Sequence, residues 1–298
     1  MDNSIIGQCG LCRNTKELRE SHIVPKFVGR KLKKTSIGSI RRADNPNCVV
    51  QDIEKHYLLC ADCEERFSGK ETWFASNIFS GFIDNGQKRF EYNSELYYFI
   101  VSLSWRSLFM DLKEYVNDVQ FDAKLLDILL KNEKNMRMYL LGEREDAGDI
   151  KNHIFFLDRI DSSNFCASDF PNVVMHRSIT SYTVYGEKTM FTISKLMGIV
   201  IVTFYTMSED EVWINTEINM NSGVIEAKNQ KICSEVGKEF EYWMEQAKCA
   251  QSNISEKQRE KIIEKLKKAW DNIEDYAIYQ DWLDDANFLN TLDSMDHD

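Results

Sequence analysis

The chain has 298 residues, which is enough for one large or two ordinary domains, and its 43% hydrophobic content can build a core. No apolar run reaches about 18 residues, and the N-terminal Met-Asp-Asn-Ser lacks the basic and apolar parts of a signal peptide, so we expect a cytoplasmic protein without a membrane partner. The net charge of -11 is unevenly spread, because residues 1–90 have 15 Lys and Arg against 11 Asp and Glu, a balance of +4, whereas the rest has 22 against 37, a balance of -15. This asymmetry predicts that the N-terminal part meets phosphate and the remainder does not.

Two Cys-x2-Cys pairs mark the N-terminal part, Cys9 with Cys12 and Cys60 with Cys63. Each pair can form a knuckle whose thiolates reach one zinc ion at about 2.3 Å, and two pairs are a much more specific signal than one. The segment between them, residues 13–59, is longer than a simple zinc ribbon allows, so a folded insert must fill it. We therefore predict a structural Zn²⁺ bound by all four cysteines.

The insert has recognisable elements of its own. The run Ser21-His22-Ile23-Val24-Pro25 predicts the start of a strand or hairpin that holds the imidazole, and a short helix to residue 34 follows the proline. A loop over 35–47, a strand over 54–59 and a helix over 64–79 complete it, and we expect the arginine pair on the loop to move freely. Basic residues gather between the imidazole and the second knuckle, where they either dock a phosphodiester backbone or form an ordinary solvated face: Lys26, Arg30, Lys31, Lys33, Lys34, Arg41 and Arg42.

These motifs together resemble the HNH nucleases over about residues 8–75. The resemblance implies a ββα-metal, treble-clef-like fold in which a hairpin with a general-base histidine meets a helix with metal ligands, and a structural zinc replaces a core. It implies that His22 activates water and that Glu64 stands where the family has a metal-binding His or Asn. The chain departs from the family at Ser21, usually His or Asp, and at Ser68, often a second ligand, while His56 lies in the region of the family's central Asn.

The residues themselves supply candidates for each part of nuclease chemistry, which needs an activated water and a cation on the leaving oxygen. Imidazoles titrate near neutral pH, which suits His22 as the base. Glu64 offers the oxygen that Mg²⁺ or Mn²⁺ prefers, Glu71 lies on the same helix face seven residues later, and Glu20 could replace Ser21. The alternatives are a ring satisfied within the hairpin, a solvated helix face for both helix glutamates, and a structural rather than catalytic role for His56.

The rest of the chain predicts a larger α+β domain over 94–298, separated by a linker at 81–93 from a zinc-binding domain at 1–80. We expect a mostly antiparallel sheet of about five or six strands with helices before and after it. The acidic tail from residue 281 is expected to be a frayed end or, alternatively, a cover for the basic head. The predicted helices lie at 96–112, 121–141, 231–251 and after a capping box at 255–258, and the strands at 153–160, 178–185, 189–194, 196–205 and 212–218.

The leading hypothesis is a metal-dependent endonuclease that hydrolyses DNA, with a body that senses a ligand or substrate, binds a protein partner or pairs with a second copy of the chain. The HNH resemblance also implies a place in bacterial defence against phage or foreign DNA. The competing hypothesis is a zinc-stapled nucleic-acid-binding adaptor that has lost the second metal site and does not cut.

Overall fold

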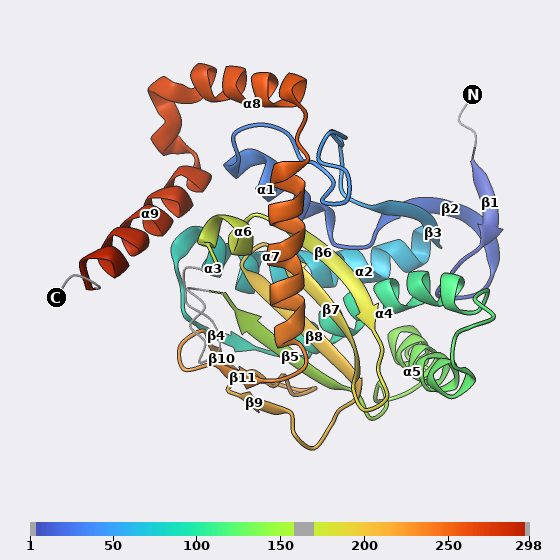
Figure 1. The fold of residues 1–298 in the computed structure, drawn as a ribbon. Coiled ribbons are helices and arrows are strands. Elements are labelled where there is room, and N and C mark those ends of the chain that lie inside the picture. The colour runs from blue at the N-terminus through green and yellow to red at the C-terminus, as the bar shows by residue number, and fades with distance from the viewer. Residues whose placement is uncertain (1–3, 158–169, 296–298) are drawn as a thin grey trace. The chain divides into compact units, whose positions relative to one another are not determined.

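The computed structural model describes residues 4–157 and 170–295 (Figure 1). Contacts divide the chain into two compact units that alternate along the sequence, which differs from the division expected at residues 81–93. Unit 1 comprises Met1–Pro25, Glu54–Phe156 and Thr180–Ser234, and unit 2 comprises Lys26–Ile53, Leu157–Ile179 and Glu235–Asp298. None of the described helices combines the length and the apolar character that a bilayer crossing demands.

Unit 1 begins with a three-stranded antiparallel sheet in the order β1 (Ile5–Gln8), β2 (Thr15–His22), β3 (Lys55–Cys60). The strand predicted over 54–59 is thus confirmed as β3. The ladder between β2 and β3 shifts register between Arg19 and Glu20, and beyond this bulge Ser21 pairs with His56 and His22 with Lys55. The bulge changes which side chains of β2 face the helix that follows β3.

That helix, α2 (Ala61–Phe74), runs on through a π-helical turn, η1 (Ala75–Phe79), into α3 (Ser80–Asn85). Along this segment Phe67, Phe74 and Phe79 are buried, and Trp73 is half-buried. Residues 81–93, expected to be a linker, instead contain most of α3 and the strand β4 (Arg89–Tyr92). Polar and glycine residues there close a helix rather than mark a flexible segment, since Gly86 has a φ of 62° at its C-terminal end.

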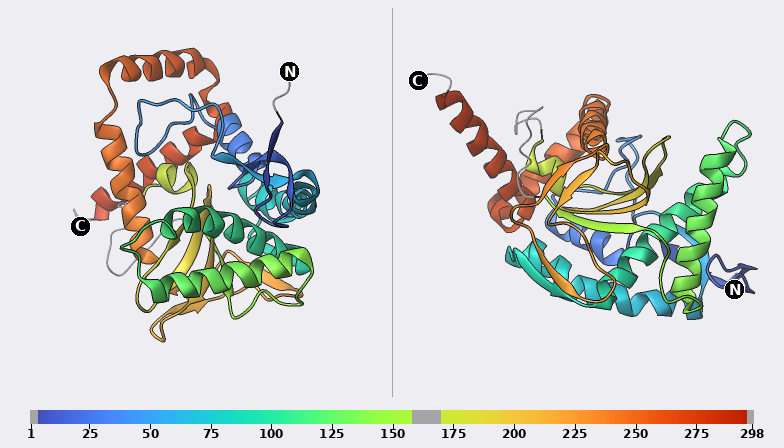
Figure 2. Two further views of the ribbon diagram at one scale, coloured as in Figure 1. Left: turned by 90° about the vertical axis from the view of Figure 1, so that its right-hand side faces the viewer. Right: turned by 90° about the horizontal axis from the view of Figure 1, so that it is seen from below.

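Two long helices of unit 1 pack against each other, α4 (Ser94–Tyr115) and α5 (Ala123–Leu141), and Figure 2 shows them side by side. Asn93 and Asp122 cap their N-termini by accepting hydrogen bonds from backbone amides of the first turn. Both helices confirm the predicted ranges. Most of α4 is buried, as its apolar sequence predicts.

The main sheet has four strands in the order β5-β8-β7-β6: β5 (Lys151–Phe156), β6 (Ile179–Val184), β7 (Met190–Leu196) and β8 (Ile199–Thr206). β8 pairs antiparallel with β5 and β7 and is buried on both faces, as its continuous apolar run predicts. Further strands form two separate ribbons, so the expectation of one sheet of five or six strands is wrong. They are β4 with β10 (Gly223–Glu226) and β9 (Val212–Ile214) with β11 (Lys231–Cys233), the last in a segment predicted to be helical.

Unit 2 contains the helices α1 (Lys26–Thr35), α6 (Asn172–His176), α7 (Gly237–Ser252), α8 (Glu256–Ala269), the 3₁₀ turn η3 (Trp270–Asp275) and α9 (Ala277–Met295). The segment at 36–53 between α1 and unit 1 is a loop. α1 confirms the short helix expected after Pro25. Ser255 caps α8 by position but its side chain makes no capping hydrogen bond, so the predicted capping box is not formed. The acidic tail, expected to be frayed, is helical to Met295.

Candidate metal centre and its surroundings

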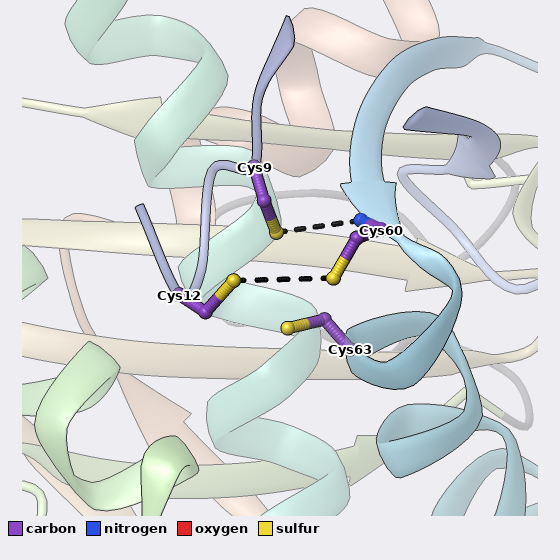
Figure 3. Close-up of side chains that lie close together, drawn as sticks. All are labelled: Cys9, Cys12, Cys60 and Cys63. Carbon is purple, nitrogen blue, oxygen red and sulfur yellow. Dashed lines mark hydrogen bonds between the residues drawn. The ribbon is translucent and has the colours of Figure 1, made fainter. Parts of the chain in front are cut away.

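The four predicted zinc ligands come together in unit 1, with their sulfurs pointing toward one another (Figure 3). All four Sγ atoms lie within 4.8 Å of each other, and those of Cys12 and Cys60 are 3.9 Å apart. Thiolates bound tetrahedrally at about 2.3 Å would be separated by about 3.8 Å. The donor set and its spacing therefore fit a structural zinc ion.

Local backbone geometry produces each knuckle. The first lies in the β1–β2 turn, where Arg13 has a left-handed φ of 62° and its amide donates to the carbonyl of Cys9 at 2.9 Å. The second joins the end of β3 to the first turn of α2, and the Cys60 amide donates to Cys9 Sγ at 3.3 Å. Gly10 is required between the first two ligands, because a Cβ there would lie 2.8 Å from Leu58 Cδ1 and 3.0 Å from the Phe109 ring.

The thiols share their protons as closely spaced ligands do. The pKa of Cys9 is lowered to about 4, first because the Cys63 thiol donates a hydrogen bond to it and then because backbone amides do so too. The pKa of Cys63 is raised, since deprotonation would break that bond and bury a second negative charge beside Cys9. Four thiolates in this space would need a cation beside them, and a thiophilic divalent metal such as Zn²⁺ fits this donor set.

The first knuckle is anchored to the long helices. Arg13 Nη2 lies 2.9 Å from Glu133 Oε1 on α5, and the guanidinium lies 4.9 Å from the centre of the Phe109 ring. Trp105 Nε1 on α4 donates to the same Glu133 oxygen at 3.0 Å. This buried carboxylate thus connects the first knuckle of the cysteine cluster to α4 and α5, and no local sequence signal indicates the link.

His22, the predicted general base, ends β2 and is half-buried. Its carbonyl oxygen accepts a hydrogen bond from Arg106 Nη1 at 2.9 Å, and 1% of the Arg106 side chain is exposed. Arg106 belongs to α4, far along the sequence from the motif that contains His22. No pattern in the sequence near either residue indicates this contact with the histidine backbone.

Glu64, the predicted ligand of a catalytic cation, faces the end of β2. Its Oε2 accepts a hydrogen bond from Ser21 Oγ at 2.6 Å, and Ser21 is fully buried. Position 21 on the hairpin and position 64 in the first turn of α2 are therefore adjacent. The bond also orients the carboxylate, because it ties one of its two oxygens to the strand.

The other predicted site residues each form an ion pair or a close contact with an oppositely charged or titratable side chain. Glu71 pairs with Arg106 at 2.7 Å, Glu20 pairs with Lys55 at 2.6 Å, and His56 Nε2 lies 2.7 Å from Glu54 Oε1. Within residues 4–157 and 170–290, the four cysteines are the only group of three or more His, Cys, Asp or Glu side chains placed closely enough to bind a metal ion. The structure thus does not gather Glu20, Glu64 and Glu71 with His22 into a second cluster of that kind.

The predicted phosphate-binding residues belong to unit 2. Lys26, Arg30, Lys33 and Lys34 are exposed on α1, and Lys31 is half-buried there. The expectation that the loop arginines move freely is wrong for this structure: Arg41 donates to the Pro46 carbonyl at 2.8 Å and to Gln258 Oε1 at 3.1 Å, and Arg42 Nε donates to Asp44 at 2.9 Å. The loop folds back on itself through an antiparallel bridge between Arg41 and Val49, and the turn residues of this segment do not indicate that pairing.

No protein-family model matches the chain, and neither a curated protein nor a solved structure shows a significant match to it.

Proposed function

We propose that the protein is a metal-dependent endonuclease of the HNH type that hydrolyses DNA phosphodiester bonds. The contact between Ser21 Oγ and Glu64 Oε2 carries this proposal. In the resembled family, metal ligands occupy the residue before the base and the residue after the last cysteine. In this chain the side-chain oxygens at those two positions lie 2.6 Å apart, beside a four-cysteine cluster.

In this proposal each residue has a defined role. The half-buried His22 accepts the proton of the attacking water, and Arg106 holds the backbone of the strand that ends at this histidine. The half-buried carboxylate of Glu64, oriented by the buried hydroxyl of Ser21, presents a hard oxygen of the kind to which Mg²⁺ or Mn²⁺ binds while keeping several waters. A divalent ion bound there would neutralise the charge that develops on the leaving oxygen.

The zinc site has a different role in the proposal. Its four thiolates hold the β1–β2 turn to the start of α2, and Glu64 directly follows the last of them. Zn²⁺ with four sulfur ligands has no open position for substrate, so it fixes the backbone and takes no part in hydrolysis. Loss of zinc would therefore abolish activity by releasing α2 from the hairpin.

The ion pairs of the predicted acidic ligands favour a second candidate function. Glu71 is occupied by Arg106 and Glu20 by Lys55, and Ser21 is a weak ligand, which together favour an adaptor that binds nucleic acid without cutting it. In this alternative the ion pairs replace the second metal site. Cleavage activity separates the two functions.

The test is a plasmid-nicking assay with Mg²⁺ and with Mn²⁺. We expect wild-type protein to nick the plasmid, and His22→Ala and Glu64→Gln each to lower the rate by at least about 100-fold. Glu65→Gln is the matched control, because Glu65 is the exposed neighbour of Glu64 on the same helix, and it should keep the wild-type rate. Cleavage that survives both substitutions would remove the assignment of the site, and no cleavage by wild type with either metal would favour the adaptor.

The resemblance also supports a place in defence against phage or foreign DNA. We expect expression of the wild-type protein in a bacterial host to lower plaque counts, and His22→Ala to restore them. Equal plaque counts for both proteins would leave the cleavage chemistry without this biological role.

A further inference from the structure

The exposed side of α1 carries a concentrated positive charge. The helix has five basic residues and no acidic one, and its apolar side chains Val28 and Leu32 are buried. Burial of this apolar face turns the charged side chains outward. It also leaves no large apolar stripe on α1 that could insert into a bilayer.

The loop after α1 is fastened to α8 within unit 2 (Figure 1). Arg41 Nη2 donates to Gln258 Oε1 at 3.1 Å, and Lys265 Nζ donates to Ser39 Oγ at 2.6 Å. At the start of α8, the Ser255 amide donates to Asn47 Oδ1 at 2.9 Å. These contacts along the helix place α8 beside the loop that carries the arginine pair.

The side of α8 next to this loop is a lysine stripe. Lys257, Lys261 and Lys265 follow one another at intervals of four residues, so they lie on one helix face, and all three are exposed. Lys265 is the member that contacts the loop. The stripe therefore extends the positive charge of the loop arginines along α8.

α8 also carries Glu256, Glu260 and Glu264, each one position before a lysine of the stripe, and Glu264 pairs with Lys268 at 2.6 Å. Its six basic residues outnumber these three glutamates, so the helix keeps a net charge of +3.

A second group of acidic residues lies on α9. α9 contains four Asp residues and no Lys or Arg, and two of these Asp residues are bound by α6 and the residue after it. Asp281 lies 3.0 Å from His176 Nδ1 and 2.5 Å from Arg177 Nε, and Asp285 accepts hydrogen bonds from the amides of Asn172 and Val173 at 2.8 and 3.0 Å. These carboxylates are thus committed to holding α9 rather than to neutralising the lysine stripe.

We propose that α1, the loop at 36–53 and α8 form one surface that binds the phosphodiester backbone of a nucleic-acid duplex, with Lys257, Lys261 and Lys265 as phosphate contacts. The proposal deepens the proposed function by adding α8 to the surface that binds its substrate class. Basic side chains on two helices and a loop give electrostatic, sequence-independent attraction to a polyanion. The partner is chosen by charge complementarity, and the buried apolar face of α1 favours nucleic acid over an anionic membrane.

The test measures binding separately from cleavage. Full-length protein without added Mg²⁺ or Mn²⁺ is titrated into a fluorescently labelled duplex of DNA, and in a parallel arm of RNA, across a range of salt concentrations. The triple variant Lys257→Gln, Lys261→Gln, Lys265→Gln should bind on the order of tenfold more weakly, and the slope of log affinity against log salt should fall by up to about 3, because each phosphate contact contributes about 0.9. A triple Lys→Arg variant at the same positions should restore binding.

A matched control exists on α5 of unit 1, where Lys124, Lys131 and Lys134 are exposed on one helix face. Their triple Gln variant removes the same charge and should bind like wild type. If the α8 variant binds and responds to salt like wild type, this inference is overturned. Protein that binds vesicles of anionic lipid but neither duplex overturns it in favour of a membrane surface.

The outcomes also separate this inference from the nuclease proposal. Wild-type protein that binds duplex through α8 but never nicks plasmid supports this surface and removes the nuclease. If wild type nicks plasmid and the α8 variant binds and nicks equally well, only the surface is removed.

Discussion

Arg106 Nη1 lies 2.7 Å from Glu71 Oε1, and 1% of the arginine side chain and 21% of the glutamate side chain are exposed. The same nitrogen donates to the carbonyl of His22, and the guanidinium lies 5.5 Å from the centre of the Phe67 ring. One buried charge on α4 thus connects α2 to the end of β2. Breaking one partner of such a pair costs more than removing both, because a lone buried charge remains.

We therefore expect Glu71→Gln to lower the free energy of unfolding by about 2–4 kcal/mol, and the double variant with Arg106→Met and Glu71→Gln to cost less than the sum of the two single changes. Urea denaturation of the four proteins in this cycle measures the coupling. The exposed Glu65→Ala should change stability by less than about 0.5 kcal/mol. Additive effects of the pair would show that the ion pair contributes no coupling.

Zinc content tests the cysteine cluster directly. Purified protein should contain one zinc ion per chain by elemental analysis. Cys63→Ser should lose the ion and unfold at a lower temperature, because its free energy of unfolding falls by on the order of several kcal/mol. Cys233→Ser is the control, because this exposed cysteine lies outside the cluster. Full zinc occupancy in the Cys63 variant would place the ion elsewhere.

Two glycines should respond in opposite directions to the same substitution. Gly10→Ala places a Cβ 2.8 Å from Leu58 inside the first knuckle and should destabilise the protein by about 1–3 kcal/mol. Gly69→Ala lies within α2 with no atom within 4 Å of the new Cβ, so it should stabilise by about 0.5–1 kcal/mol through helix propensity. Thermal unfolding of both variants measures the contrast, and equal shifts of the same sign would contradict it.

His153 predicts a stability change at acid pH. Burial lowers its pKa to about 4, with a smaller contribution from Lys151. Between the usual histidine pKa of about 6.5 and pH 4, the unfolded chain binds a proton that the folded chain does not, so this group destabilises the fold as pH falls, by about 3 kcal/mol at most. His153→Phe should therefore lose less stability than wild type between pH 7 and pH 4.5 in denaturant titrations.

Asp111 acts with the opposite sign over much of the same range. Burial raises its pKa to about 6, so between pH 4 and 6 the folded chain holds a proton that the unfolded chain has lost, and stability falls as pH rises. Asp111→Asn should therefore make the protein more sensitive to acid than wild type. The same pH dependence in Asp111→Asn, His153→Phe and wild type would contradict both assignments.

The sequence predicts features that depend on local spacing. Cys9 with Cys12 and Cys60 with Cys63 identify the ligand cluster, and the unbroken apolar run of β8 identifies a strand buried on both faces. The regular spacing of α4 and α5 identifies long helices, and their predicted ranges agree with the structure. These features need only the periods of helices and strands and the reach of a knuckle.

Features that depend on contacts between residues far apart in the chain cannot be predicted from the sequence alone. The bond between Arg106 and the His22 carbonyl joins residues 84 positions apart, and no pattern near either residue indicates it. The composition of the tail predicts a frayed acidic end. The tail is instead a helix whose Asp281 and Asp285 contact α6. The β9–β11 ribbon also depends on a distant pairing, since Lys231–Cys233 reads locally as the start of a helix.

The aromatic contacts of α2 determine whether the four-cysteine motif can be transferred to another protein. Phe74 stacks on Phe99 with ring centres 4.1 Å apart, and Phe67 meets Trp105 edge to face at 6.1 Å. A fragment ending before α4 would expose both phenylalanine rings to water, so the motif would not fold stably without that helix. Grafting it onto another scaffold requires transplanting α4 with it.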